Sequence, residues 1–186
     1  MASAFSHAFV ALALGKVPRQ SLLSWRTVCL GMLCSVVPDL DVLGFYVGIP
    51  YEHVLGHRGL SHSLPFAGVM SGLLVGLLYR QYSARVKTAV FFYLLLCTAS
   101  HGLLDAMTDG GLGVAFFSPL DTTRYFFSFR PVVVSPIGIG KFVGERAFGV
   151  LKSEAKWILL PTAGVFMGLR MLQGLKSSWE RRSGRR

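Results

Sequence analysis

Apolar stretches divide the sequence, and each is bounded by proline, charged or other polar residues. A helix needs about 20 mostly apolar residues to cross a membrane, and most of these stretches approach that length. The pattern predicts an all-α fold: a polytopic helical membrane protein with about four to five apolar helices. We expect these helices over Ala2–Gly15, Leu22–Val37, Ser61–Tyr79, Val86–Met107 and Trp157–Leu175.

Two longer polar segments separate these helices. The first is a loop from Asp39 to Leu60, which follows a stop at Pro38. The second, from Thr108 to Lys156, holds three prolines and several glycines and therefore cannot be one long helix. Within it, residues 130–136 are consistent with a short strand or a re-entrant piece. We therefore expect one helical membrane domain over residues 1–175, with a long irregular loop, and a basic, disordered tail over residues 176–186.

The composition supports the membrane interpretation. Charged residues make up only 15% of the chain, against about 25% in soluble domains, and the mean hydropathy is +0.52. The N-terminal stretch lacks a basic region, and His7 interrupts it, so we expect a retained first helix rather than a signal peptide.

The formal net charge of +10 raises the possibility of nucleic-acid binding. The basic residues, however, lie between the apolar stretches and in the tail, where they suit anionic lipid headgroups and topology signals better. We therefore expect membrane lipid as a partner and no specific nucleic acid. The positive-inside rule assigns the loops near Arg19 and Arg85, and the tail, to the cytoplasmic face.

The potential metal ligands gather at the opposite face. All five histidines precede residue 102, and counting helices places each of them, with the nearby carboxylates, at or near that face. These residues are His7, His53, His57, His62 and His101, with Asp39, Asp41, Glu52, Asp105 and Asp109. The cysteines Cys29, Cys34 and Cys97 lie inside apolar stretches without a C-x-x-C pair, so we interpret them as packing residues.

The spacing of these residues suggests how they meet. His101 and Asp105 are four residues apart and share one face of a helix. Ionisable residues inside a membrane segment are costly and indicate function by default, although a structural hydrogen bond is the alternative. Asp39 and Asp41 can both reach one cation from a turn, or one of them can cap a helix.

The segment from His57 to Ser63 adds two imidazoles and Arg58 near a helix start, and Gly59 permits a close approach there. An interfacial polar loop is the alternative. Nitrogen and oxygen ligands without sulfur suit a divalent metal, zinc first, with manganese or iron also compatible. A carboxylate that is not a ligand can act as a base toward water, so metal-assisted hydrolysis is the natural reaction class.

These motifs resemble those of the bacterial membrane-bound metal-dependent hydrolase family typified by YdjM. The resemblance covers about residues 3–140. It rests on Ser6-His7, Pro38-Asp39-Leu40-Asp41, the run from His57 to Ser63, Ser100-His101 with Asp105, Phe117-Ser118-Pro119, Arg124 to Phe127, and Ser135-Pro136. It implies a multi-pass protein of the cell inner membrane.

A fainter similarity is to zinc-dependent phospholipase C and the single-strand-specific zinc nucleases. Those soluble helical enzymes present their ligands in the order His, Asp, His and then His-x-x-x-Asp, which this chain repeats. They supply further ligands downstream, but no histidine follows His101 here. One or two metal ions are therefore expected, rather than three.

Residues and resemblance together predict a hydrolase that cleaves a phosphoester in a lipid-like substrate at the membrane face. The expected metal ligands are His7, Asp39, His57, His62, His101 and Asp105. Asp41 is expected to be a ligand or the general base, and Arg58 and Arg124 to hold an anionic group by bidentate contacts. The alternatives are a non-catalytic metal- or ion-binding membrane protein or a transporter, and a structural protein that binds anionic lipid through its tail.

Overall fold

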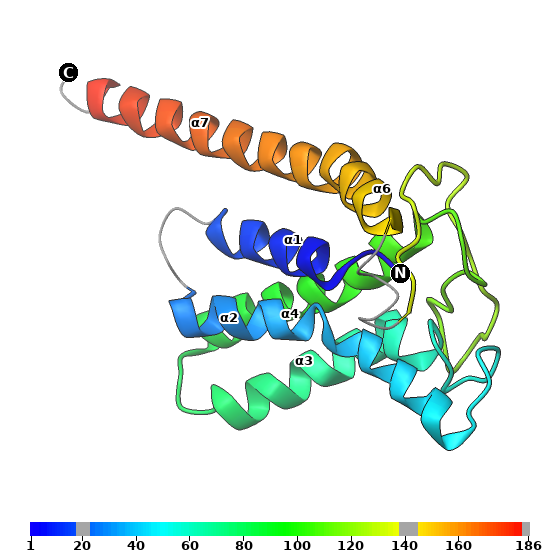
Figure 1. Ribbon diagram of the computed structural model, residues 1–186. Coiled ribbons are helices and arrows are strands. Elements are labelled where there is room, and N and C mark those ends of the chain that lie inside the picture. The colour runs from blue at the N-terminus through cyan, green and yellow to red at the C-terminus, as the bar shows by residue number, and fades with distance from the viewer. Residues whose placement is uncertain (18–22, 138–144, 184–186) are drawn as a thin grey trace.

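The computed structural model describes residues 1–17, 23–137 and 145–183, and these residues form helices and loops without a named strand (Figure 1). The predicted helical membrane fold is confirmed. The helices are α1 (Ala4–Lys16), α2 (Trp25–Cys34), the 3-10 helices η1 (Val37–Val47) and η2 (Leu60–His62), α3 (Leu64–Leu78), α4 (Ala84–Ala106), α6 (Glu145–Glu154), the π-helical turn η3 (Ala155–Leu159) and α7 (Leu160–Ser183).

Helix α4 is the centre of the bundle, because α1, α2 and α3 all pack against it. The main apolar core lies between these helices and includes Ala11, Val28, Leu94 and Cys97. Tyr93 also lies there, and its hydroxyl donates to the carbonyls of Ala11 and Val28. Cys34 and Cys97 are free and buried, as expected for packing residues.

Three helical stretches are long and apolar enough to cross a membrane: Trp25–Val47, Ala84–Ala106 and Ala147–Glu180. Helices α1 and α3 are apolar but shorter. Figure 1 shows α6, η3 and α7 as one long helix that lies on the α1 side of the bundle, away from α3. Only a small share of its apolar window is buried, so most of this helix is left to face lipid.

Some predicted boundaries were wrong. The second helix was expected to stop at Pro38, but the chain continues as η1 to Val47. Pro38 lies in the first turn of η1, where its missing N–H needs no helical partner. The long loop was expected to reach Lys156, but α6 already begins at Glu145. Polar residues interrupt the apolar pattern in α6, so that pattern did not predict this helix.

The basic tail also differs from the expectation of disorder. Helix α7 continues through Ser183, and residues 184–186 lie outside the described part of the chain. No glycine or proline interrupts residues 175–183, and Leu, Lys, Glu and Arg are good helix formers, so the helix has no local reason to end earlier.

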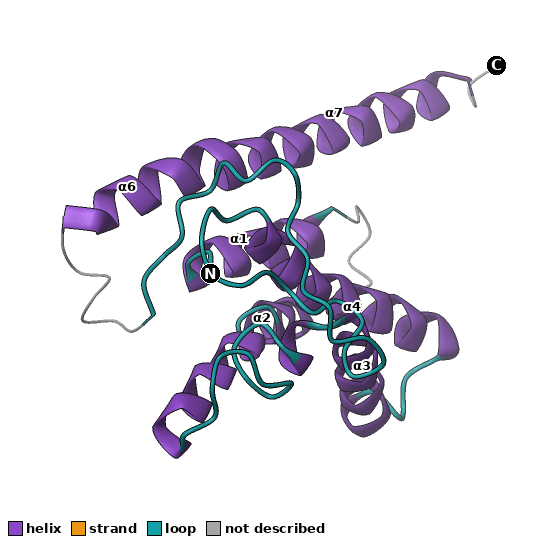
Figure 2. Cartoon of the chain, turned by 90° about the vertical axis from the view of Figure 1, so that its right-hand side faces the viewer, coloured by secondary structure: helices purple, strands orange, loops and turns teal. Residues whose placement is uncertain are grey.

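The two long loops, residues 48–59 and 107–137, gather at one end of the bundle, around the N-terminal segment (Figure 2). Within them, Val132 forms an isolated bridge with Thr108, and Val114 forms another with Tyr125. A second small core of Ala2, Val132 and Ile158 joins the N-terminal segment, the long loop and η3. This end of the bundle carries the predicted site.

Candidate metal centre

Four of the predicted ligands converge between η1, η2 and α4. Asp39, His62, His101 and Asp105 each offer one ligand atom, and these atoms all lie within 4.8 Å of one another. Their side chains are buried, with at most 8% exposed. The shared position of these residues, expected from helix counting, is therefore what the structure shows.

Gly102 allows this approach between η2 and α4. A Cβ atom at this position would lie 2.8 Å from the backbone carbonyl of His62, closer than real Cβ contacts come. The absence of a side chain beside His101 lets η2 pack directly on α4. The two imidazole rings then lie 4.6 Å apart between centroids.

The hydrogen bonds of both imidazoles fix which nitrogen faces the centre. Nδ1 of His101 lies 2.7 Å from the Ser35 carbonyl, which can only accept. Nδ1 of His62 lies 2.9 Å from the hydroxyl oxygen of Ser61, which donates its own proton to Oδ2 of Asp41, and 3.1 Å from that carboxylate oxygen. If each Nδ1 carries the proton, as these acceptors require, both Nε2 atoms turn a lone pair toward the centre. Metal-binding histidines are typically held in this way.

Four of the six separations among the four ligand atoms are close to those around a tetrahedral ion, and all six lie within 4.8 Å. Ligands about 2.1 Å from such an ion are about 3.4 Å from one another. The Nε2 atoms of His62 and His101 are 3.1 Å apart. Oδ1 of Asp39 is 3.2 Å from Nε2 of His101 and 3.7 Å from Nε2 of His62. Oδ2 of Asp105 is also 3.7 Å from Nε2 of His62.

The unpaired oxygens of Asp39 and the buried negative charge of the cluster also fit a bound cation. Neither carboxylate oxygen of Asp39 has a hydrogen-bond partner, because the approach of His101 is not oriented for one. Two buried carboxylates, Asp39 and Asp105, belong to the cluster, and the buried guanidinium of Arg58 pairs with Asp105 alone. Buried charge needs compensation, and a divalent cation would supply it.

Asp105 is held from several sides. Its Oδ2 accepts from Nε of Arg58 at 3.0 Å, and its Oδ1 accepts from the backbone N–H of Ala2 at 2.7 Å. Arg58 also donates to the Thr108 hydroxyl and to the Gly110 carbonyl. The guanidinium is fully buried, and its contacts favour holding Asp105 over contacting a substrate. The predicted role of Arg58 in anion binding remains a prediction.

The backbone around Arg58 explains how this side chain reaches the interior. Arg58 has a φ of 63°, in the left-handed region that residues other than glycine rarely adopt. A Cβ atom on the adjacent Gly59 would lie 2.3 Å from the Val54 carbonyl, so the close approach predicted at this glycine is present. The loop therefore turns tightly here and directs the guanidinium inward.

His7 lies at the edge of the centre. Its ring stacks on that of His101, with centroids 3.8 Å apart, and its Nε2 lies 3.6 Å from Oδ1 of Asp105. Both ring nitrogens are buried without a hydrogen-bond partner. His7 thus contacts the centre, as predicted for a ligand, but it does not belong to the group of four.

Asp41 and His57 form a second group with His62. Oδ1 of Asp41 lies 2.7 Å from Nδ1 of His57, and its Oδ2 accepts from Ser61 and from the backbone N–H of Arg58. Burial lowers the pKa of His57, although Asp41 opposes this, whereas for His62 burial is outweighed by the contacts with Asp39 and Asp41, which raise the pKa to about 9. A metal ion would therefore displace a proton from His62 on binding. Asp41 lies behind both histidines, where it orients their rings.

The remaining predicted residues lie outside the centre. Arg124 donates to the carbonyls of His57, Gly113, Tyr51 and His53, so it joins two loops. His53 and Glu52 are exposed loop residues. Asp109 follows Asp105 by four residues, but α4 ends at Ala106 and Asp109 accepts from the N–H of Val134.

Sequence reasoning missed Glu154, at the end of α6. Its carboxylate is 1% exposed and accepts from the N–H and hydroxyl of Ser3 and, at 2.7 Å, from the hydroxyl of Ser6. It thereby fixes the N-terminal segment that reaches Asp105 through Ala2. A lone acidic residue just before an apolar stretch was the signal. It was overlooked because no partner lies near it in sequence.

The fold and this centre define a class of protein: a helical inner membrane protein with a buried His/Asp cluster that can hold a metal ion. The chain belongs to the YdjM inner membrane protein family, whose sequence model matches residues 1–176. It is similar to the inner membrane protein YbcI of Escherichia coli (strain K12), with 33% identity over 161 residues, which cover 87% of this chain and 92% of that protein. No solved structure matches the chain.

Proposed function

We propose that this protein is a membrane-bound metal-dependent hydrolase that cleaves a phosphoester in a lipid-like substrate at the membrane face. The observation that carries the proposal is the convergence of two imidazole Nε2 atoms and two carboxylates, with four separations of 3.1–3.7 Å and all of them within 4.8 Å. Asp39, His62, His101 and Asp105 would hold the ion, which would need a further coordination position for water. Zinc suits this donor set, and manganese and iron are also compatible.

Each neighbouring residue has a part in this proposal. A divalent cation, when bound, supplies polarisation of a phosphoryl oxygen and a lower pKa for water. Asp41, expected to be a ligand or the general base, has both oxygens occupied by protein donors and would instead orient His57 and His62. His7 is not one of the four ligands and retains unpaired ring nitrogens, so it would accept the proton from the attacking water.

The alternative is a protein that binds or conducts a metal ion without turnover. The two adjoining groups, which share His62, favour this alternative, because linked sites also serve ion pathways. The two functions differ in whether a substrate is consumed.

The first test is the metal content of detergent-purified protein. We expect about one metal ion per chain, estimated from one tetrahedral site, and a loss of that ion in His101→Ala and Asp39→Asn. His53→Ala is the matched control, because His53 is exposed and outside the cluster. Unchanged metal content in His101→Ala would show that the cluster is a polar packing network.

The second test is turnover of phosphomonoester and phosphodiester substrates by the same preparations. Hydrolysis by the wild type and by His53→Ala, but not by His101→Ala, supports the hydrolase. Bound metal without hydrolysis of either class, together with metal uptake in proteoliposomes, would instead support the non-catalytic alternative.

A further inference from the structure

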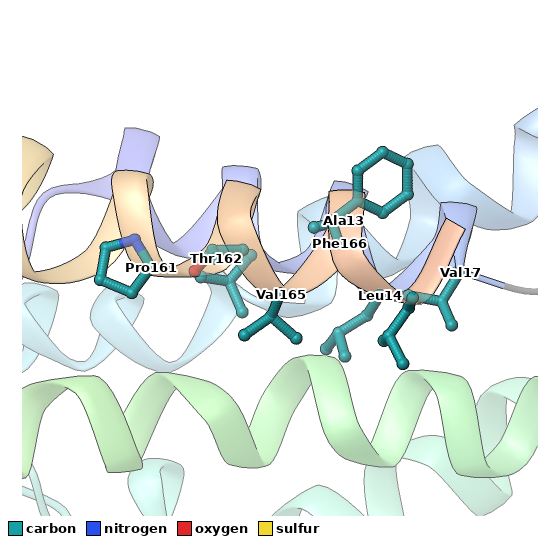
Figure 3. Close-up of a pocket in the computed structure, with 9 residues that line it drawn as sticks. Ala13, Leu14, Val17, Pro161, Thr162, Val165 and Phe166 are labelled. Carbon is teal, nitrogen blue, oxygen red and sulfur yellow. The ribbon is translucent and has the colours of Figure 1, made fainter. Parts of the chain in front are cut away.

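An apolar groove of about 320 Å³ lies between α1 and α7 (Figure 3). Val10, Leu14 and Val17 line it from α1, and Pro161, Val165 and Phe166 are among the residues that line it from α7. The volume is far larger than the roughly 30 Å³ of one water molecule. Val165 is 65% exposed, so the groove is open along α7.

The position of the groove excludes water as its occupant. Helix α7 belongs to the stretch Ala147–Glu180, which is long and apolar enough to cross a membrane, and the groove follows it over about two turns. Water does not fill an apolar space at this depth, and an empty space would forfeit dispersion contacts. A hydrocarbon chain satisfies both conditions.

The two ends of the groove differ in charge. At the end near the metal centre, Glu154 already accepts from Ser3 and Ser6. At the other end, Gln173 donates to the carbonyl of Val17 at 2.9 Å and so fixes α7 against the last turn of α1. Lys176 lies three residues further along α7 on the same helix face. The ammonium of Lys16, by contrast, lies over the Trp25 ring of α2, 4.8 Å from its centroid. Both lysines are exposed.

We propose that this groove binds one acyl chain of an anionic phospholipid, whose phosphate is held at the end marked by Lys176. The apolar lining selects a hydrocarbon chain, and the basic residue selects a negative headgroup. This lipid site is separate from the metal centre, uses none of its residues and goes beyond the proposed hydrolysis.

The test is native mass spectrometry of the delipidated, full-length protein, titrated with phosphatidylglycerol or with phosphatidylcholine. We expect one phosphatidylglycerol adduct at concentrations where phosphatidylcholine binds about fivefold less, because a lysine near an anionic headgroup favours it. Val165→Trp fills the groove and should remove the adduct. Met167→Trp adds the same bulk at a matched depth on α7, outside the lining, and should keep it.

The role of Lys176 in binding the headgroup is tested separately. Lys176→Gln should bring the affinities for the two lipids together, whereas Arg85→Gln, an exposed charge at the start of α4, should leave the preference unchanged. Metal content should stay at the wild-type level in all four variants, which keeps this test independent of the hydrolase.

Three results would overturn the proposal. An unchanged adduct in Val165→Trp would place the lipid elsewhere. Equal binding of the two lipids by the wild type would show that the protein does not recognise the anionic headgroup. A dimer mass that Val165→Trp converts to monomer, without any lipid adduct, would show that a helix of a second copy fills the groove.

Discussion

The contacts of α1 with α4 and with α7 differ in both chemistry and packing. Near its start, α1 meets α4 where His7 stacks on His101 and contacts Asp105, and all three side chains are fully buried. Further along, Val10, Leu14 and Val17 line a groove with α7 that stays open. One short helix therefore contributes to a closed polar centre and to an open apolar groove.

The difference follows from what drives packing in a membrane. Apolar side chains gain little by leaving lipid for one another, so an apolar interface can stay open. Buried carboxylates and imidazoles find no partners in lipid, so the chain must surround them with its own donors and acceptors. We therefore expect substitutions on the α4 side to be costly and those on the α7 side to be mild.

The largest effect is expected at Arg58. Arg58→Met removes the buried cation that donates to Asp105, and breaking a buried ion pair costs about 3–5 kcal/mol. Thermal unfolding in detergent would measure the loss, once in EDTA and once in zinc. Because a bound ion would also compensate Asp105, the loss should be smaller in zinc.

Arg124→Met is the matched control for this comparison. Arg124 is half-buried and donates to carbonyls that loop motion can open to water, so its loss should cost about 1 kcal/mol. Equal costs for the two variants would contradict the idea that charge burial at Asp105 sets the stability of this end.

The second prediction concerns the connection between the two sides. Glu154→Ala leaves the N–H and hydroxyl of Ser3 and the hydroxyl of Ser6 without their acceptor, which should cost about 2–3 kcal/mol. It should also weaken the packing of α6 and α7 against α1, and a faster rate of proteolysis in detergent would measure this. Glu180→Ala, an exposed change near the end of α7, should stay within about 0.5 kcal/mol of wild type.

Much of the fold was visible in the sequence, for a physical reason. Apolar stretches such as Val86–Met107 are long because the membrane demands it, so the observed α4, Ala84–Ala106, differs from the prediction by only two residues at its start and one at its end. The α4 pair of His101 and Asp105 could be predicted from helical spacing alone, because four residues make about one turn.

The rest of the site depends on contacts between distant segments, which spacing does not encode. The turn to Asp41 and the inward path of Arg58 follow from η1 and from a left-handed residue, neither of which has a periodic signal. Glu154 meets Ser3 across 151 residues. Sequence patterns therefore predicted which residue types form the centre. They did not predict which side chains point toward the ion and which only orient other ligands.

The third prediction compares glycines on the two sides. Gly102→Ala places a Cβ atom 2.8 Å from the His62 carbonyl and must push η2 away from α4. Such overpacking costs about 1–3 kcal/mol, and it should weaken zinc binding as His62 moves from His101. In α7, a Cβ atom on Gly168 meets nothing within 4 Å. Gly168→Ala should therefore raise helix stability by up to about 1 kcal/mol and leave zinc binding unchanged.

Isothermal titration with zinc, together with unfolding curves, would measure both glycine variants. Zinc affinity unchanged in Gly102→Ala would mean that η2 and α4 need not touch for the ion to bind. That result would weaken the assignment of His62 and His101 to one ion.

The smallest effect is expected from the end of α7, which lies furthest from the polar side. Deleting residues 177–186 removes exposed positions such as Trp179 and Glu180, and the hydrogen bonds of Ser177 and Ser183 stay within α7. Metal content should therefore equal that of the wild type.

Membrane retention of the deletion should fall only slightly. Each basic residue near an anionic membrane surface contributes about 1 kcal/mol of attraction, which is little beside the insertion of the apolar helices. Metal analysis and membrane fractionation of the deletion would check both points. A variant that replaces Arg181, Arg182, Arg185 and Arg186 by glutamine separates charge from length. If the deletion released the metal ion, the two sides of α1 would be coupled through α7, and the contrast between a closed polar side and an independent apolar side would fail.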